Sequence, residues 1–172
     1  MQPIAMRGVS SVVAKSIGIP FRVHRPFSTF FPEATLESDA YHAQFDAQPL
    51  NRLLGIRLIE QRRDFGRICL TKTAATPQGI GGSVHGGILA AMVDTAMLVA
   101  VFSNLHPDST PAGTADLNIT YLRPAHGREI FADATVIKRG RQMAMVEVSI
   151  SDDQGRLCAK GRTLYAFRTV AT

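Results

Sequence analysis

The sequence predicts an α+β fold in which a curved, mostly antiparallel sheet wraps around one long helix. In the last third of the chain, strand-like segments follow one another and are joined by short turns, an order typical of hairpins. Residues 86–103 are apolar on nearly every side of a helix, so other parts of the molecule must cover this helix. A sheet curved around a central helix satisfies both observations.

The first half of the domain supplies the helices. Leu50, Leu53 and Leu54 recur at helical spacing, so residues 48–55 predict a short helix that Gly55 can end. Residues 56–60 and 66–73 are expected to be strands around a polar turn. A glycine-rich loop then leads to the long helix, expected from Gly86 to Ser103.

The second half is expected to be strands. Residues 105–113 are rich in turn formers and predict a connection. The strand predicted from Thr114 to Arg123 alternates, with odd residues 115–121 on one face and even residues 116–120 on the other. Two strands, 129–139 and 142–151, are joined through Gly140, and a last strand covers 156–167.

The 172 residues suffice for one domain with a sizeable core. We expect a basic, disordered leader or N-terminal extension over residues 1–41 and a single domain over 42–170. An organelle transit peptide is the alternative for the leader, because it is rich in serine and arginine and poor in acids. The distant cysteines Cys69 and Cys158 argue against a disulfide scaffold or zinc site and fit a reducing compartment. We therefore expect the cytoplasm, or the mitochondrial matrix if the leader is a transit peptide.

The net charge of +5 arises mainly from the leader, in which four basic residues and no acid precede Glu33. The rest of the chain is almost neutral, which argues against a nucleic-acid partner. The longest apolar run, 88–102, would rise about 22 Å as a helix, less than the roughly 30 Å hydrocarbon core of a bilayer. No membrane partner is expected.

Asp94 is the first candidate catalytic residue, because it interrupts this apolar helix. A buried ionised carboxylate loses several kcal/mol of solvation unless it is compensated. A catalytic carboxylate is one interpretation of this position, and a structural hydrogen bond across an interface is the other.

His85, Gly86 and Gly87 begin the same helix. Free backbone N–H groups and the positive end of the helix dipole lie at this end, and glycines let a carbonyl oxygen approach. This arrangement can form an oxyanion hole, although glycines also serve simple turns. Gly86 and Asp94 are about 12 Å apart along the helix, so one chain cannot bring both to one carbonyl. If they share a reaction, Asp94 must come from a partner subunit whose helix packs antiparallel.

Four segments carry a family resemblance: "GGSVHGGILAAMVDTAM", "TADLNITYLRPA", "ADATVIKRGRQMAMVEVSISD" and "GRLCAKGRTLYAF". Together, over about residues 48–168, they closely resemble the hotdog-fold acyl-CoA thioesterases of the phenylacetate-degradation type. The resemblance implies a six-stranded antiparallel sheet around a central helix, in homodimers that usually pair again into tetramers. It also implies an acyl-CoA substrate and neither metal nor cofactor.

The resemblance assigns roles to four residues. The N–H matching Gly86 polarises the thioester carbonyl, and the histidine matching His85 supports the site. The carboxylate matching Asp94, from the partner chain, acts as general base or nucleophile. A hydroxyl matching Thr114 helps to place the water.

One position departs from the family. An Asn or Gln often lies seven residues before the glycine matching Gly86, and this chain has Gly79 there. Gln78, one residue earlier, takes its role if the loop adjusts by one residue. Without a replacement, water would be placed less well.

Coenzyme A carries phosphates, for which cations at the strand ends are the candidates. These candidates are Arg123, Lys138, Arg139 and Arg141, with Gly87 as a further substrate contact. The glycine-rich loop lacks the Lys-Ser/Thr pair of a phosphate loop.

Two other functions stay open. A hotdog hydratase or dehydratase of 3-hydroxyacyl thioesters would pair His85 with Asp94, and a non-catalytic acyl-CoA-binding dimer would lack turnover. A serine hydrolase is disfavoured, because the sequence has no GxSxG motif. The acyl group is not determined, since aromatic, branched and medium-chain tails all suit an apolar groove.

Overall fold

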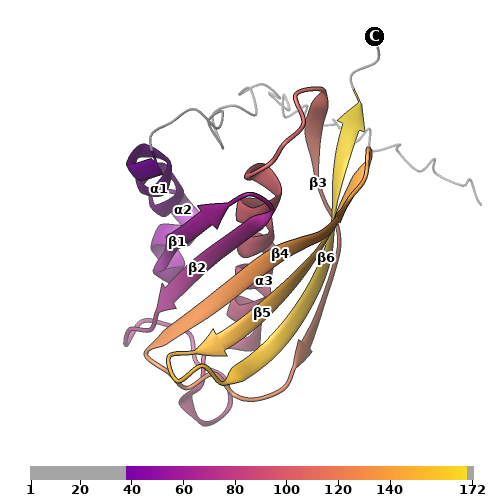
Figure 1. The fold of residues 1–172 in the computed structure, drawn as a ribbon. Helices are drawn as coiled ribbons and strands as arrows, with labels where there is room; N and C mark the ends of the chain where they lie inside the picture. The colour runs from indigo at the N-terminus through magenta and orange to yellow at the C-terminus, as the bar shows by residue number, and fades with distance from the viewer. Residues whose placement is uncertain (1–37, 170–172) are drawn as a thin grey trace, which may run out of the picture.

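A computed structural model describes residues 38–169, and the predicted leader up to residue 37 lies outside the described residues. The first element, α1 (Ser38–Asp46), spans the boundary expected at residue 42 (Figure 1). It is followed by α2 (Pro49–Leu54), where a short helix was predicted. Gly55 ends α2 in the left-handed conformation, with φ of 71°.

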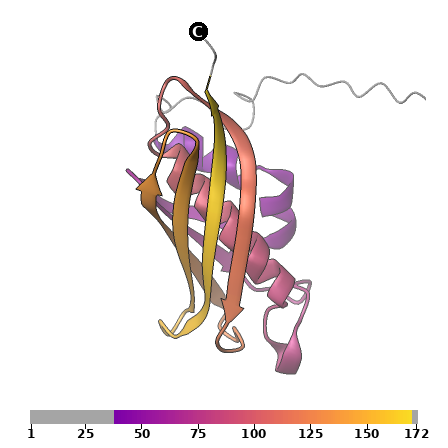
Figure 2. The same ribbon diagram turned by 90° about the vertical axis from the view of Figure 1, so that its right-hand side faces the viewer.

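The sheet has six strands in the order β1-β2-β4-β5-β6-β3, and every neighbouring pair is antiparallel. The strands are β1 (Ile56–Arg62), β2 (Phe65–Thr71), β3 (Ser109–Tyr121), β4 (Glu129–Arg139), β5 (Met143–Asp152) and β6 (Leu157–Thr169). The long helix α3 (Gly86–Phe102) lies against one face of this curved sheet (Figures 1 and 2). The predicted fold class is confirmed.

Small residues on the inner face of the sheet let α3 approach closely. Ala132, Ala134 and Ala144 are fully buried beneath the helix. A Cβ atom added at Gly66 would lie 2.5 Å from Val99 Cγ1. The helix is correspondingly buried on most sides, as its apolar sequence predicted.

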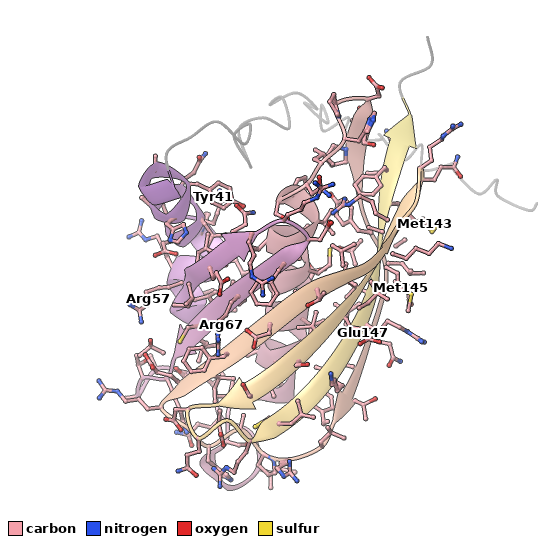
Figure 3. All side chains as sticks on the ribbon, viewed as in Figure 1. Tyr41, Arg57, Arg67, Met143, Met145 and Glu147 are labelled. Carbon is pink, nitrogen blue, oxygen red and sulfur yellow. The ribbon has the colours of Figure 1, made fainter. Side chains whose placement is uncertain are left out.

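The outer face of the sheet is more polar. Along β5, Met143, Met145 and Glu147 project outward while the residues between them are buried (Figure 3). On β2, Arg67 lies 3.2 Å from Asp133 of β4. The alternation gives one face to the core and the other to solvent.

β3 differs from its prediction in length and register. It begins at Ser109 rather than Thr114, so part of the expected connection is strand. Pro111 is tolerated because β3 is an edge strand, which among the six described strands pairs with β6 alone. A bulge between Thr114 and Asp116 interrupts the expected alternation, so Ala115 is exposed and Thr114 lies opposite the buried Tyr165.

The C-terminal end of α3 is held by polar side chains. Three of them donate hydrogen bonds to its last carbonyls: Gln61 Nε2 to Val99 (2.9 Å), Ser103 Oγ to Ala100 (2.7 Å) and Arg139 Nη2 to Val101 (3.1 Å). Asp64 joins the group, because it accepts from Arg139 (2.7 Å) and Asn104 (3.0 Å). This network ties the helix end to β1, β4 and the β1–β2 turn.

Candidate active site

The loop before α3 is anchored on both sides and delivers His85 to the helix start. The Val84 N–H donates to the Ala125 carbonyl (2.9 Å), and the His85 N–H donates to that of Pro77 (3.1 Å). At the tip, η2 (Ile80–Gly82) turns the chain, with Gly81 at a φ of 61°. The backbone contacts fix where the helix begins.

His85 caps the N-terminus of α3. Its Nδ1 accepts from the Gly87 N–H (3.0 Å), and its carbonyl accepts from Ile88 (2.9 Å). The Gly86 N–H has no hydrogen-bond acceptor among residues 38–169. This N–H, at the positive end of the helix dipole, is available to a ligand oxygen.

Tyr121, which was not a predicted site residue, completes this end of the helix. Its hydroxyl donates to the Gly86 carbonyl (2.9 Å), and a Cβ atom at Gly86 would lie 3.3 Å from its ring. The side chain is 51% exposed. The available signal was the alternation of β3, which places Tyr121 on the same face as Leu117 and Ile119, toward the helix.

Asp94 and Thr114, two predicted site residues, are in contact. Thr114 Oγ1 donates to Asp94 Oδ1 at 2.7 Å. The β3 bulge makes this contact possible, because it turns Thr114 toward α3. Burial and the nearby Asp94 charge raise the pKa of Tyr165, opposite Thr114, to about 12. Tyr165 therefore stays a neutral phenol beside the carboxylate at neutral pH.

The candidate residues therefore form two groups on one helix, the candidate half-sites. Gly86 lies in the first turn of α3, and Asp94 lies about 12 Å further along its axis. His85, Gly86, Gly87 and Tyr121 surround the first position, and Thr114 supports the second. One carbonyl group cannot reach both.

Gln78 lies in the anchored loop, where it forms an antiparallel bridge with Val84. Side chains of consecutive residues in an extended segment point to opposite faces. Gln78 therefore points to the same face as Val84, and Gly79 lies on the same face as Ser83. A Cβ atom at Gly79 would lie 3.1 Å from Ser83 Oγ and 3.4 Å from His85 Cα. Within residues 38–169, no hydrogen bond joins Gln78 to His85 or Gly86.

The four predicted phosphate-binding cations do not form one group. Arg123 follows β3 near the start of α3, and it donates to the Leu157 carbonyl (2.9 Å). Lys138, Arg139 and Arg141 lie at the β4–β5 turn, at the opposite end of α3, because β4 runs the length of the sheet between the two groups. Arg139 is engaged with Asp64 and Val101, whereas Lys138 and Arg141 are exposed.

Three further observations concern residues 38–169. No group of three or more His, Cys, Asp or Glu residues that could hold a metal ion is found there. None of the helices in this range has the length and apolar character needed to cross a membrane. Cys69 and Cys158 are free and buried, and burial raises the pKa of both thiols.

Comparison with known proteins places the chain among thioesterases. A family model described as the thioesterase superfamily matches residues 81–159, which include the candidate half-sites and most of the sheet. Human acyl-coenzyme A thioesterase 13 is 30% identical over 122 residues, which are 70% of this chain and 86% of that protein. A Halobacterium salinarum protein that carries the name "putative esterase" is 46% identical over 70 residues, which are 40% of this chain and 46% of that protein. This chain therefore spans less than half of that relative.

A solved structure agrees with the fold. The PaaI protein from the phenylacetic acid degradation operon of Escherichia coli has a TM-score of 0.61 and 26% identity. The match covers 73% of this chain and 92% of PaaI. The six-stranded sheet, the long helix α3 and the sequence relatives agree: the chain belongs to the thioesterase superfamily and has its hotdog fold.

Proposed function

We propose that the protein hydrolyses acyl-CoA thioesters to the free acid and CoA. The observation that carries this proposal is the Gly86 N–H, which has no acceptor among the described residues at the start of α3. The name of the human relative, acyl-coenzyme A thioesterase 13, supports the same substrate class. The proposal includes neither a metal nor a cofactor.

Gly86 and Asp94 divide the chemistry between them. The Gly86 N–H stabilises the negative charge that develops on the thioester oxygen. Asp94 of the partner subunit takes a proton from water, whose oxygen bonds to the acyl carbon as the carbon–sulfur bond breaks. The CoA sulfur leaves as a thiolate and takes up a proton. Alternatively, the Asp94 carboxylate attacks the acyl carbon itself, and water then hydrolyses the mixed anhydride.

Thr114 orients the carboxylate for either route. Its hydroxyl donates to Asp94 Oδ1, so Oδ2 stays available for a water molecule or for the acyl carbon. His85 supports the Gly86 end through its cap on Gly87. We retain Gln78 as a candidate for water placement that depends on a loop adjustment.

The proposed active unit is a homodimer with antiparallel α3 helices. β3 has 13 residues and a partner strand on one side only, so its free edge suits pairing with a second copy. We further propose that dimers pair into tetramers and that the enzyme works in the cytoplasm.

The dimer also suggests how cations reach the coenzyme. If the partner's Asp94 lies level with Gly86, the C-terminal end of its antiparallel helix lies about 12 Å beyond Gly86. The exposed Lys138 and Arg141 belong to that end. We propose that they contact the CoA phosphates from the partner subunit, with Arg123 contributing from the same subunit as Gly86.

Thiol release from a panel of acyl-CoAs tests the function. Aromatic, branched and medium-chain thioesters should release free CoA thiol, and their relative rates would define the acyl preference. A hydratase would change 3-hydroxyacyl or enoyl thioesters without releasing thiol, and a binding module would bind CoA esters without turnover. Either result would contradict hydrolysis.

Two matched variants test the oxyanion contact. G86P removes the backbone N–H and introduces a Cβ contact with Tyr121. Proline is tolerated at the first helical position, and the φ of −60° and ψ of 136° at His85 suit a residue before proline. Its kcat should fall about 10²- to 10³-fold. G86A keeps the N–H and introduces a similar contact with Tyr121, so it should retain most of its activity.

A mixed dimer tests the shared site. D94N should lower kcat by about 10²- to 10⁴-fold. Co-expression of D94N and G86P chains should restore about a quarter of wild-type turnover, because one of four site combinations has an intact Gly86 and an intact Asp94. If each site used residues of one chain, no turnover would return.

A further inference from the structure

The peptide group between Gly86 and Gly87 is hydrogen-bonded on both sides. Tyr121 Oη donates to its carbonyl oxygen (2.9 Å). Its N–H donates to His85 Nδ1 (3.0 Å). A continuous chain of hydrogen bonds therefore runs from the tyrosine hydroxyl through one peptide group to the imidazole ring.

This chain determines which nitrogen of His85 carries the proton. Because Nδ1 accepts a hydrogen bond, it is unprotonated in the neutral ring, and the proton is on Nε2. The neutral imidazole then offers one donor, Nε2–H. His85 is exposed, so this donor is accessible at the start of α3.

Tyr121 strengthens this arrangement. Hydrogen bonds that share a peptide group polarise one another, so donation to the Gly86 carbonyl makes the Gly87 N–H a better donor to Nδ1. The absence of a side chain at Gly86 lets the ring approach, since a Cβ atom there would lie 3.3 Å from two ring atoms. Tyr121 also holds the orientation of the peptide plane.

We propose that Tyr121 is a positioning residue that acts through the Gly86–Gly87 peptide to hold His85 in its Nε2–H form. This inference rests on the proposed function in one respect. In thioester hydrolysis, the Nε2–H of His85 and the Gly86 N–H would form a pair of donors at the helix start. The hydrogen-bond chain itself does not depend on activity.

The protein contains a natural reference for this effect. His106 Nδ1 accepts from the Asp108 N–H (3.2 Å), two residues later in the chain, as His85 does from Gly87. No tyrosine hydroxyl donates to the peptide before Asp108 among the hydrogen bonds of residues 38–169. The two histidines therefore differ in the contact that the proposal concerns.

Imidazole ¹⁵N spectra of the full chain at pH 8 test the proposal without a substrate. Wild-type protein should show His85, assigned with H85N, as a single Nε2–H tautomer. Y121F keeps the ring and removes the hydroxyl, so a fraction of His85 should shift to the Nδ1–H tautomer while His106 stays unchanged. Unchanged His85 resonances in Y121F would overturn the proposal, whether or not the protein hydrolyses thioesters.

Kinetics give the second readout. Y121F should lower kcat about two- to tenfold, the effect of one neutral hydrogen bond, with little change in KM. Y41F is the matched control, because Tyr41 pairs with Gln61 away from the helix start. An active enzyme whose kcat is unaffected by Y121F would also overturn the proposal. Lack of thiol release by the wild type would contradict the proposed function and leave the spectral test intact.

Discussion

The two ends of α3 are completed in opposite ways. At the C-terminal end, Gln61, Ser103 and Arg139 donate to the last carbonyls, and Asp64 holds Arg139 in place. At the N-terminal end, His85 caps Gly87, and the Gly86 N–H has no acceptor among residues 38–169. The same helix is therefore fixed by its carbonyl end and offers its amide end to a ligand. Variants that remove the contacts to the last carbonyls should change mainly stability, and variants that remove the Gly86 N–H should change mainly turnover.

Two glycine-to-alanine substitutions should show the largest contrast. A Cβ atom at Gly66 would lie 2.5 Å from Val99 Cγ1 and 2.9 Å from the Ala100 nitrogen, so G66A must displace helix backbone. We expect it to lower the free energy of unfolding by about 3 kcal/mol. The Cβ atom that G86A introduces would lie nearest to the Tyr121 side chain. The free energy of unfolding of G86A should therefore stay within about 1 kcal/mol of wild type. Urea unfolding measures both, and equal losses would remove the contrast.

Asp64 tests the C-terminal end of α3 directly. D64A leaves the partly buried Arg139 without its carboxylate partner and places alanine at a φ of 58°, so we expect a loss of about 2 kcal/mol in unfolding free energy. D64N keeps a residue that tolerates this conformation and should lose less. D108A, at the exposed pair with His106, is the charge-matched control. Thiol release per folded molecule should be unchanged in all three, and a selective loss of turnover in D64A would contradict the division between the ends.

Variants of His85 distinguish helix capping from a role in hydrolysis at the N-terminal end of α3. H85A removes the side-chain cap on Gly87 and should lower unfolding free energy by about 1 kcal/mol. H85N restores a capping oxygen and most of that stability, but it lacks the imidazole N–H. Its thiol release should stay reduced, on the order of tenfold below wild type. Recovery of both stability and turnover in H85N would show that the histidine serves only as a cap.

The smallest effect on stability is expected at the β5–β6 turn, near the N-terminal end of α3. The Arg156 side chain, followed by N–H donation from Arg156 and Gln154, lowers the pKa of Asp152 below its ordinary 3.8. A carboxyl whose pKa is lowered by folding stabilises the fold above pH 3.8, and this contribution disappears as pH falls through the folded-state pKa. The free energy of unfolding, measured with urea, should therefore fall less for R156Q than for the wild type between pH 5 and pH 2. Parallel pH curves would argue against this contact.

The periodicity of apolar residues and the positions of glycine and proline predict much of this fold. The apolar helix from Gly86, the short helix before Gly55 and the hairpins around Gly140 follow from local patterns. The helix α1 and the early start of β3 do not, since the first has no clear apolar period and the second contains Pro111. Edge position is a tertiary property, and it decides whether a proline is tolerated.

The site was predictable where it depends on helical spacing. The position of Gly86 and its separation from Asp94 follow from α-helix geometry. The tyrosine over Gly86 and the separation of Arg123 from Lys138 and Arg141 depend on strand order, which the sequence does not reveal. Thr114 became a candidate through family resemblance alone, and its contact with Asp94 was not predicted, because a bulge cannot be recognised from alternation.

That bulge has a consequence for how the chain tolerates length changes. Ala115 is the extra residue that brings both Thr114 and Leu117 onto the inner face. Deleting Ala115 would restore one-to-one pairing with β6, and Thr114 would stay opposite Tyr165, on the same face as Leu117. A one-residue shortening at Ala115 should therefore keep the contact between Thr114 and Asp94, which makes the bulge a position where β3 tolerates a change in length.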